Sequence, residues 1–193
     1  MIANLSRGVA GFTSNVFLCT GDRTVLVDTG SNYDVVTAVR EHVGTLDAVV
    51  LTHAHPDHVA NVQALREAFD VETWGFDDGS EHVDHAVGDG ERVRIGDHAY
   101  EALHTPGHAV DHLVFCAADA GTAFVGDLVF ANGAFGRTDF DGGDHRLLVE
   151  SIERVLDVLD ERYDVLYPGH GPDMTEPIAD VETSLRAARA TPP

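Results

Sequence analysis

The sequence predicts a single α/β domain in which helices cover both faces of the sheet structure. Two observations predict this class. Short strand-like runs are joined partly by hairpin turns and partly by segments with helical spacing. The chain has 193 residues, 44% of them hydrophobic, which is enough for one sizeable core. With no internal repeat, low-complexity segment or linker, we expect one domain spanning 1–193.

The first half begins with a predicted hairpin, whose strands at 16–19 and 24–27 turn around Gly21-Asp22. Ser31 followed by Asp34 is typical of a capping box, and valines at helical spacing then predict a helix over 35–43. A short apolar strand is expected at 47–52. Pro56 favours the start of a helix that continues to residue 69 on one apolar face.

The second half opens with a Gly- and acid-rich loop from about 75 to 90. The clearest helix is expected over 144–159, where leucine, isoleucine and valine form one stripe, and a last helix over 177–188. Strands are predicted at 92–95, 99–104, 112–116, 122–125 and 163–167.

The chain is strongly acidic, with 33 acidic residues against 12 basic ones and a formal net charge of −21. Every basic residue is an arginine. We expect adaptation to molar salt, where the screening length falls to about 3 Å at 1 M, rather than a merely acidic protein. The charge argues against a nucleic-acid partner and against an anionic membrane surface.

The chain offers no apolar run of membrane-spanning length and no basic-then-apolar leader at its start, so we expect a cytoplasmic protein. Cys19 and Cys116 both lie in apolar strand-like runs, without metal-ligand spacing. We expect them to be buried free thiols. The oligomeric state is not predictable from these features.

The most informative segment follows the apolar strand at 47–52. It places four metal-ligand side chains within six residues: His53, His55, Asp57 and His58. Neither a core nor a surface requires that density of imidazole and carboxylate. A divalent metal held with an open position makes water a nucleophile at neutral pH, so the pattern indicates metal-assisted chemistry.

Three further candidate ligands also stand just after strand-like runs. His108 ends Thr105-Pro106-Gly107-His108, Asp127 follows Gly126, and His170 lies in Pro168-Gly169-His170-Gly171. We expect His53, His55 and His108 to hold one metal, Asp57, His58 and His170 a second, and Asp127 to bridge the two. Nitrogen and oxygen ligands without thiolate suit zinc, our first expectation, with iron or manganese as alternatives.

This series of motifs resembles the metallo-β-lactamase superfamily, from Asp28-Thr29-Gly30 through His170. The resemblance implies an αββα four-layer sandwich with a metal pair at one sheet edge. It implies that Asp28 is a carboxylate that steadies a ligand, although a turn aspartate after a strand is the alternative reading. His112, four residues beyond His108, is interpreted as a packing or supporting residue rather than a ligand.

The stretch Gly136-Arg137-Thr138-Asp139-Phe140 is similar to glyoxalase II-like thioester hydrolases and to persulfide dioxygenases. The leading hypothesis is hydrolysis of a thioester of a 2-hydroxy acid by a hydroxide held between two metals. One metal would polarise the carbonyl and the other steady the leaving thiolate. Asp57 and Asp127 are the expected catalytic carboxylates, with Asp57 also orienting the hydroxide.

Arg137 is expected to bind a carboxylate or carbonyl of the substrate, and a surface ion pair with Asp139 is the alternative. Phe135 and Phe140 either line the thiol pocket or pack in the core. Glutathione is not the expected thiol, because lysine is absent and we expect no C-terminal helical domain with basic residues after His170.

Two other functions stay open. A persulfide dioxygenase-like oxygenase would hold a single iron with His53, His108 and Asp127, a two-histidine, one-carboxylate set. The segment after His170 favours hydrolysis over this oxygenase. A non-catalytic metal-binding module is the alternative from another class.

Overall fold

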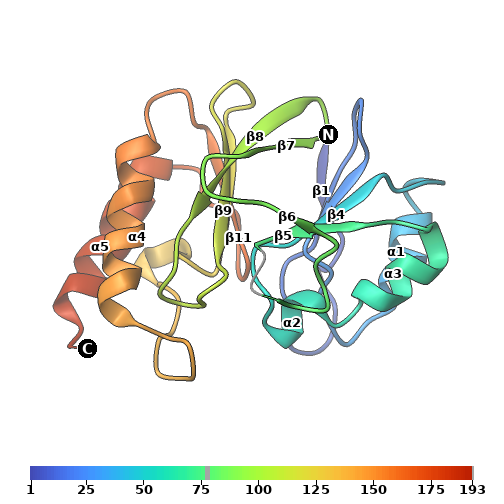
Figure 1. The fold of residues 1–193 in the computed structure, drawn as a ribbon. Helices are drawn as coiled ribbons and strands as arrows, with labels where there is room; N and C mark the ends of the chain where they lie inside the picture. The colour runs from blue at the N-terminus through green and yellow to red at the C-terminus, as the bar shows by residue number, and fades with distance from the viewer. Residues whose placement is uncertain (77–78, 193) are drawn as a thin grey trace.

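Two mixed β-sheets face each other, and helices cover their outer faces (Figure 1). The structure is a computed structural model that describes residues 1–76 and 79–192. The helices α1 and α3 lie outside one sheet, and α4 and α5 outside the other. The predicted αββα four-layer sandwich is therefore confirmed.

The first sheet is antiparallel at one edge and parallel at the other. β1, β2 and β3 pair antiparallel, whereas β3, β4, β5 and β6 pair parallel. Because β3 and β4 are parallel, the residues that follow them meet at the same edge of the sheet. In sheet order the strands are β1 (Ile2–Asn4), β2 (Phe17–Cys19), β3 (Val25–Val27), β4 (Ala48–Val50), β5 (Thr73–Gly75) and β6 (His85–Ala86).

The second sheet also brings several strand ends to one edge. β10 and β11 are parallel, while β7, β8, β9 and β10 alternate in direction, so β8, β10 and β11 all end at one edge. In sheet order its strands are β11 (Val165–Pro168), β10 (Thr122–Gly126), β9 (Leu113–Ala117), β8 (His98–His104) and β7 (Arg92–Ile95).

Three apolar clusters hold the layers together. One lies between the sheets, where Phe17 and Tyr100 pack with Phe124 at centroid distances of 5.6 and 5.4 Å. The other two join each sheet to its helices. The helices are α1 (Val35–Arg40), α2 (Pro56–Val59), α3 (Val62–Phe69), α4 (His145–Val158) and α5 (Pro177–Ala190), with a short 3₁₀ turn at Ala131–Gly133.

The capping box expected at Ser31 is wrong. The cap of α1 is Asp34, whose carboxylate accepts hydrogen bonds from the backbone N–H and the hydroxyl of Thr37. The Ser31 hydroxyl instead donates to the carbonyl of Phe12. The start expected at Asp144 is confirmed, since its carboxylate accepts from Leu147 N–H and caps α4.

The single helix expected from Pro56 to residue 69 is also wrong, because α2 ends at Val59 and α3 begins at Val62. A contact with a distant segment accompanies the break. The Asn61 amide donates to the carbonyls of Thr29 and Gly30, which ties this turn to the loop after β3.

The strands β1, β5 and β6 are unexpected. Each has two or three residues, too few for an alternating pattern to stand out. β6 lies inside the predicted loop at 75–90, of which 77–78 fall outside the described residues. Cys19 and Cys116 are buried free thiols, as predicted. Among the described residues, no helix has the length and apolar character needed to cross a bilayer.

Candidate metal centre

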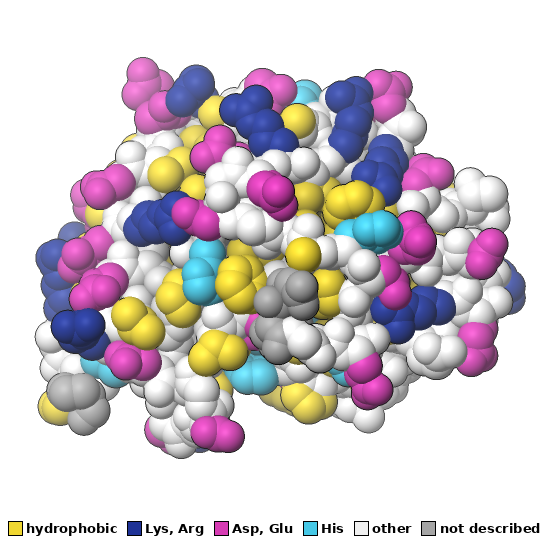
Figure 2. Space-filling view, viewed as in Figure 1, with side chains coloured by type: hydrophobic (Ala, Val, Ile, Leu, Met, Phe, Trp, Pro, Cys, Tyr) yellow, Lys and Arg dark blue, Asp and Glu magenta, His cyan; other side chains and the backbone are white. Residues whose placement is uncertain are grey.

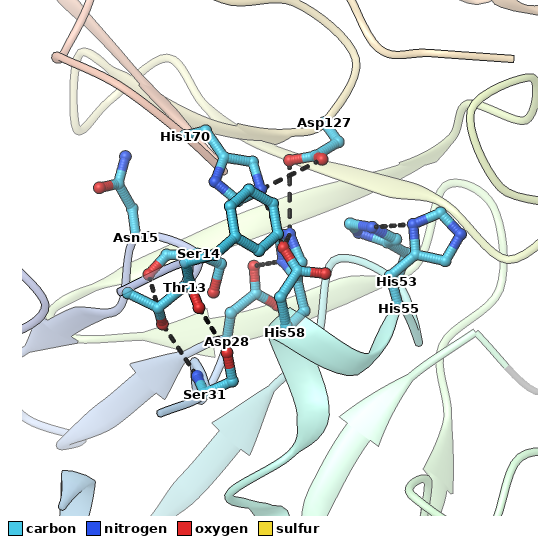
Figure 3. Close-up of polar contacts among 12 residues, drawn as sticks. Thr13, Ser14, Asn15, Asp28, Ser31, His53, His55, His58, Asp127 and His170 are labelled. Atoms are coloured by element: carbon cyan, nitrogen blue, oxygen red, sulfur yellow. Dashed lines mark hydrogen bonds and ion pairs between the residues drawn. The ribbon is translucent and has the colours of Figure 1, made fainter. Parts of the chain in front are cut away.

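The seven predicted ligands come together at the edge where the strands of both sheets end. Figure 3 labels five of them: His53, His55, His58, Asp127 and His170. His53 and His55 follow β4, and Asp57 and His58 lie in α2, so the first sheet supplies four of them. The second sheet supplies the rest, each after a strand that ends at this edge: His108 after β8, Asp127 after β10 and His170 after β11.

One group contains three histidines whose ring nitrogens converge. His55 Nδ1 lies 3.0 Å from His53 Nε2 and 2.9 Å from His108 Nε2. The second ring nitrogens of His53 and His108 are each engaged elsewhere. The Thr52 hydroxyl donates to Asp28 Oδ2 at 2.8 Å, so it accepts from His53 Nδ1 at 3.1 Å. Neutral His53 therefore turns the lone pair of Nε2 toward the cluster.

His108 is oriented in the same way by the backbone. Its Nδ1–H donates to the carbonyl of Arg137 at 2.8 Å, which leaves Nε2 as the free acceptor. Burial lowers the pKa of His53 well below its usual range and that of His55 to about 4. Burial also lowers the pKa of His108. The neutral rings of His53 and His108 thus turn lone pairs toward the point where His55 Nδ1 also lies, which is the arrangement that a cation requires.

The second group pairs two histidines with a carboxylate. His170 Nε2 lies 3.0 Å from Asp57 Oδ2, and His58 Nε2 lies 3.8 Å from the same oxygen. Burial alone would lower the pKa of both histidines, but neighbouring carboxylates raise it to about 10 for His58 and about 9 for His170. Without a cation, these rings carry protons that a bound metal would replace.

Asp127 lies between the two groups. Its Oδ1 is 3.4 Å from His58 Nε2, and its Oδ2 is 3.4 Å from His108 Nε2 and 3.5 Å from His170 Nε2. One carboxylate oxygen therefore faces ligands of both groups.

The buried polar atoms of this cluster fit a pair of cations. His58 Nε2 and Asp127 Oδ1 are both buried, and neither has a hydrogen-bond partner. Unpartnered buried polar atoms are rare in proteins, because each forfeits its interaction with water. Lone pairs of nitrogen and oxygen, without thiolate, suit zinc, iron or manganese. The donor set and its geometry thus agree with metal binding.

Asp28 connects the ligand loops at the ends of β3 and β4. Its Oδ1 accepts from Thr52 N–H at 2.8 Å, and its Oδ2 accepts from the Thr52 hydroxyl and from His58 Nδ1, each at 2.8 Å. Asp28 has a φ of 57°, a left-handed conformation that is uncommon outside glycine. This backbone turn aims the carboxylate back toward α2.

His112 supports Asp127 rather than joining the ligands. Its Nε2 accepts from the backbone N–H of Asp127 at 3.0 Å, and its Nδ1 bonds the Thr105 hydroxyl at 2.8 Å. Burial lowers its pKa to about 3, so the ring is neutral, as an acceptor must be. Gly169 also shapes this region, because a Cβ there would lie 2.0 Å from Asp127 Oδ1.

No sequence motif indicated the loop before β2, which braces the second group (Figure 3). The Asn15 amide donates to the carbonyls of Pro168 at 2.8 Å and Gly171 at 2.9 Å, holding the segment that carries His170. The Phe12 ring stacks on His170 at a centroid distance of 5.2 Å. No local sequence pattern predicts that the Asn15 amide and the Arg137 carbonyl would hold these ligands in place.

A cavity of about 290 Å³ opens beside the cluster. His55, Asp57, His108, Asp127 and His170 form its floor. Arg137 lines the cavity, but its side chain is 75% exposed and makes two hydrogen bonds of 2.9 Å to the Asp139 carboxylate. The ion pair considered as the alternative is thus present. The remaining lining residues are Phe12, Phe130, Phe135 and Phe140.

The fold and this cluster define an enzyme of the metallo-β-lactamase superfamily, to which the chain belongs: the family's sequence profile matches residues 8–170. Among curated relatives, the chain is 30% identical over 188 residues to the hydroxyacylglutathione hydrolase GloC of Haemophilus influenzae, covering 84% of this chain and 88% of that one. It is 38% identical over 135 residues to a hydroxyacylglutathione hydrolase of Cereibacter sphaeroides, covering 68% of this chain but 52% of that relative.

Solved structures agree with this placement. TTHA1623 in a di-iron-bound form superposes with a TM-score of 0.76 at 28% identity, covering 92% of this chain and 96% of that one. ETHE1 from Myxococcus xanthus superposes with a TM-score of 0.74 at 26% identity, covering 92% of this chain and 86% of that one.

Proposed function

We propose that this protein hydrolyses thioesters of 2-hydroxy acids with two divalent cations, zinc in the first instance and iron or manganese as alternatives. The observation that carries the proposal is the position of Asp127, whose carboxylate faces both ligand groups within 3.5 Å. The similarity to hydroxyacylglutathione hydrolases supports the thioester as substrate.

Each ligand group would hold one cation. His53, His55 and His108, whose ring nitrogens converge, would form the first site, and Asp57, His58 and His170 the second, with Asp127 shared between them. Bound cations supply an activated water and polarise the thioester carbonyl. A thiol leaves readily as an anion, since its pKa is about 8.5, so no separate general acid is required.

Asp57 is the proposed orienting carboxylate. It lines the cavity beside the cluster and bonds His170 through Oδ2. A carboxylate accepts several hydrogen bonds at once, so Asp57 can hold the attacking water as well as a cation. Asp127 is the second proposed catalytic carboxylate, because its placement between the groups sets where the water and the thioester meet.

Three groups are proposed to position the ligands without touching substrate. Asp28 fixes the tautomer of His58 by accepting from Nδ1, and the Arg137 carbonyl does the same for His108. His112 holds the backbone of Asp127 in place. The Arg137 side chain is proposed to bind substrate through a carbonyl, because Asp139 already satisfies its bidentate face for a carboxylate.

The test is to measure metal content and two activities on one preparation. Purified protein should contain two cations per chain and release free thiol from S-lactoyl thioesters at a rate that chelation abolishes. If a fully metal-loaded sample does not hydrolyse S-lactoyl thioesters, the proposal is contradicted.

An oxygenase is the second candidate, and the resemblance to ETHE1 is the observation that favours it. Such an enzyme would use His53, His108 and Asp127 for a single iron. We prefer two cations to one, because a single iron on those three residues would leave His58 Nε2 without a hydrogen bond or a metal, and Asp127 Oδ1 without a hydrogen bond. One iron per chain with persulfide-dependent oxygen consumption would establish the oxygenase instead.

We further propose that the protein works in the cytoplasm at high salt. On the face in Figure 2, carboxylates and arginines are scattered around a more hydrophobic central area, and the net charge of the chain is −21. Salt screens the repulsion among these carboxylates. Two free cysteines suit a reducing compartment. Dialysis into dilute buffer should unfold the chain, as followed by circular dichroism; full activity without salt would contradict this.

A further inference from the structure

We infer that this site selects thioesters whose thiol half is apolar and uncharged near the sulfur, rather than thiols that carry carboxylates. The inference rests on the proposed thioester hydrolysis and names the class of thiol. It follows from the walls of the cavity beside the metal centre, from the pairing of its arginine, and from a neighbouring cavity that continues it.

The walls are aromatic. Phe12, Phe130, Phe135 and Phe140 line the cavity together with the ligand side chains and Arg137, so the part of a substrate that extends away from the cations meets phenyl rings. Phe12 is 71% exposed, although its ring stacks on His170. An exposed phenylalanine at this position has apolar surface still available for burial by a ligand.

Phe140 lies beside the first ligand group, as Phe12 lies beside the second. Its ring meets His55 and His108 edge-on, at centroid distances of 5.1 and 5.3 Å, and it is 36% exposed. Apolar faces therefore flank both ligand groups. The thiol half of a bound thioester can therefore contact Phe12 or Phe140, depending on which ligand group it lies beside.

The charge of the cavity does not favour a carboxylate. Among the described residues that line it, Arg137 is the one arginine, and Asp139 already occupies two of its donors. A carboxylate on the thiol half, reaching away from the cations, would have to compete with Asp139 for Arg137. The Arg137 side chain is 75% exposed, so exchanging one carboxylate for another there gains little.

A second cavity of about 500 Å³ shares Phe135 and Arg137 with the first, so a longer thiol can continue into it. This cavity adds Arg146 but also Asp139 and Asp144. Its two guanidinium groups are therefore matched by two carboxylates. The continuation gives room for the thiol without creating an excess of positive charge.

The test compares three S-lactoyl thioesters that differ in the thiol: glutathione, glutathione dimethyl ester and benzylthiol. The value of kcat/KM for each is divided by its rate of alkaline hydrolysis, which corrects for leaving-group reactivity. We expect the benzylthiol ester to exceed the glutathione ester by about tenfold or more, with the diester between them.

Two pairs of variants locate the preference. Phe12→Ser should lower the ratio of the benzylthiol-ester value to the glutathione-ester value by about fivefold to tenfold, because any effect on His170 acts on both esters alike. Ile178→Ser, at an exposed site on α5 away from the cavity, is its control. Asp139→Asn should free Arg137 and raise the glutathione-ester value relative to the other two, whereas Asp141→Asn removes the same charge from the same loop and should leave the ratios unchanged.

The outcomes separate the inference from the proposed function. If no thioester is hydrolysed by metal-loaded protein, the proposed function fails, and the inference with it. If hydrolysis is present but glutathione is the preferred thiol, or if Phe12→Ser and Asp139→Asn leave the preference unchanged, the inference alone is overturned.

Discussion

Replacing Asp28 by asparagine tests whether this carboxylate orders the metal centre. The side chain is 2% exposed and accepts three hydrogen bonds, two from Thr52 and one from His58 Nδ1. Asparagine has the same shape, and it tolerates the left-handed φ of 57° better than other residues. The variant therefore removes the charge and one acceptor without straining the backbone.

The expected loss follows from these contacts. Whichever way the amide is turned, its NH₂ group faces at least one donor, and His58 loses its charged partner. A buried hydrogen bond to a charged group is worth about 1.5–3 kcal/mol. Removing one partner of a buried ion pair costs about 3–5 kcal/mol. We expect the free energy of unfolding of the metal-free variant to fall by about 3–5 kcal/mol, and cation affinity to fall about 10–100-fold.

Denaturant unfolding of chelated protein measures the first quantity, and competition with a chromophoric chelator measures the second. Asp22→Asn is the control, because Asp22 forms an ion pair of 2.9 Å with Arg94 but its side chain is 74% exposed. Its effect should be within about 0.5 kcal/mol. Unchanged unfolding and cation affinity in Asp28→Asn would refute the reasoning.

Three further predictions concern the ligands and their support. Asp127→Ala and His53→Ala should each abolish thioester turnover while circular dichroism stays native. Gly169→Ala should lower cation affinity about tenfold or more, because its Cβ would lie 2.0 Å from Asp127 Oδ1. In metal-free protein, carboxylates raise the pKa of His170 to about 9 and of His58 to about 10, against the effect of burial. The two protonated histidines therefore stabilise the folded metal-free protein. This contribution is complete below about pH 6.5, the pKa of histidine in the unfolded chain, and it is lost as the pH rises through 9 to 10.

Each of these has a clear contrary result. Retained turnover in either alanine variant would remove that residue from the catalytic set. Gly44→Ala is the control for Gly169→Ala, since a Cβ at Gly44 meets nothing within 4 Å; equal losses of cation affinity in both would refute the steric argument. A melting temperature of chelated protein that rises between pH 7 and pH 10 would contradict the direction of the histidine shifts.

The clustering of the candidate metal ligands was predictable because each stands where a strand ends. His53 to His58 follow a short apolar run, and His108, Asp127 and His170 each lie beside a glycine or proline after another. Residue types and strand ends together therefore identified the cluster. The parallel pairing of β3 with β4 and of β10 with β11, which brings these ends to one edge, was not predicted; the resemblance implied only a sandwich with a metal pair at one sheet edge.

Other features depend on contacts that sequence spacing does not encode. The carbonyl of Arg137 orients His108, and any residue can supply a carbonyl. The break between α2 and α3 depends on the Asn61 amide reaching the loop after β3, a contact between segments some thirty residues apart. Phe12 precedes β2 by several residues, and nothing local indicates that its ring would stack on His170.

The split of the ligands between the sheets affects more than catalysis. One half of the sandwich carries His53, His55, Asp57 and His58, and the other carries His108, Asp127 and His170. Each bound cation would therefore join the two halves through its ligands. A ligand that binds only the native state at a thousandfold excess over its Kd stabilises that state by about 4 kcal/mol. Under metal starvation, proteolysis would then remove the open chains, and the cell would lose the enzyme itself rather than keep a store of inactive copies.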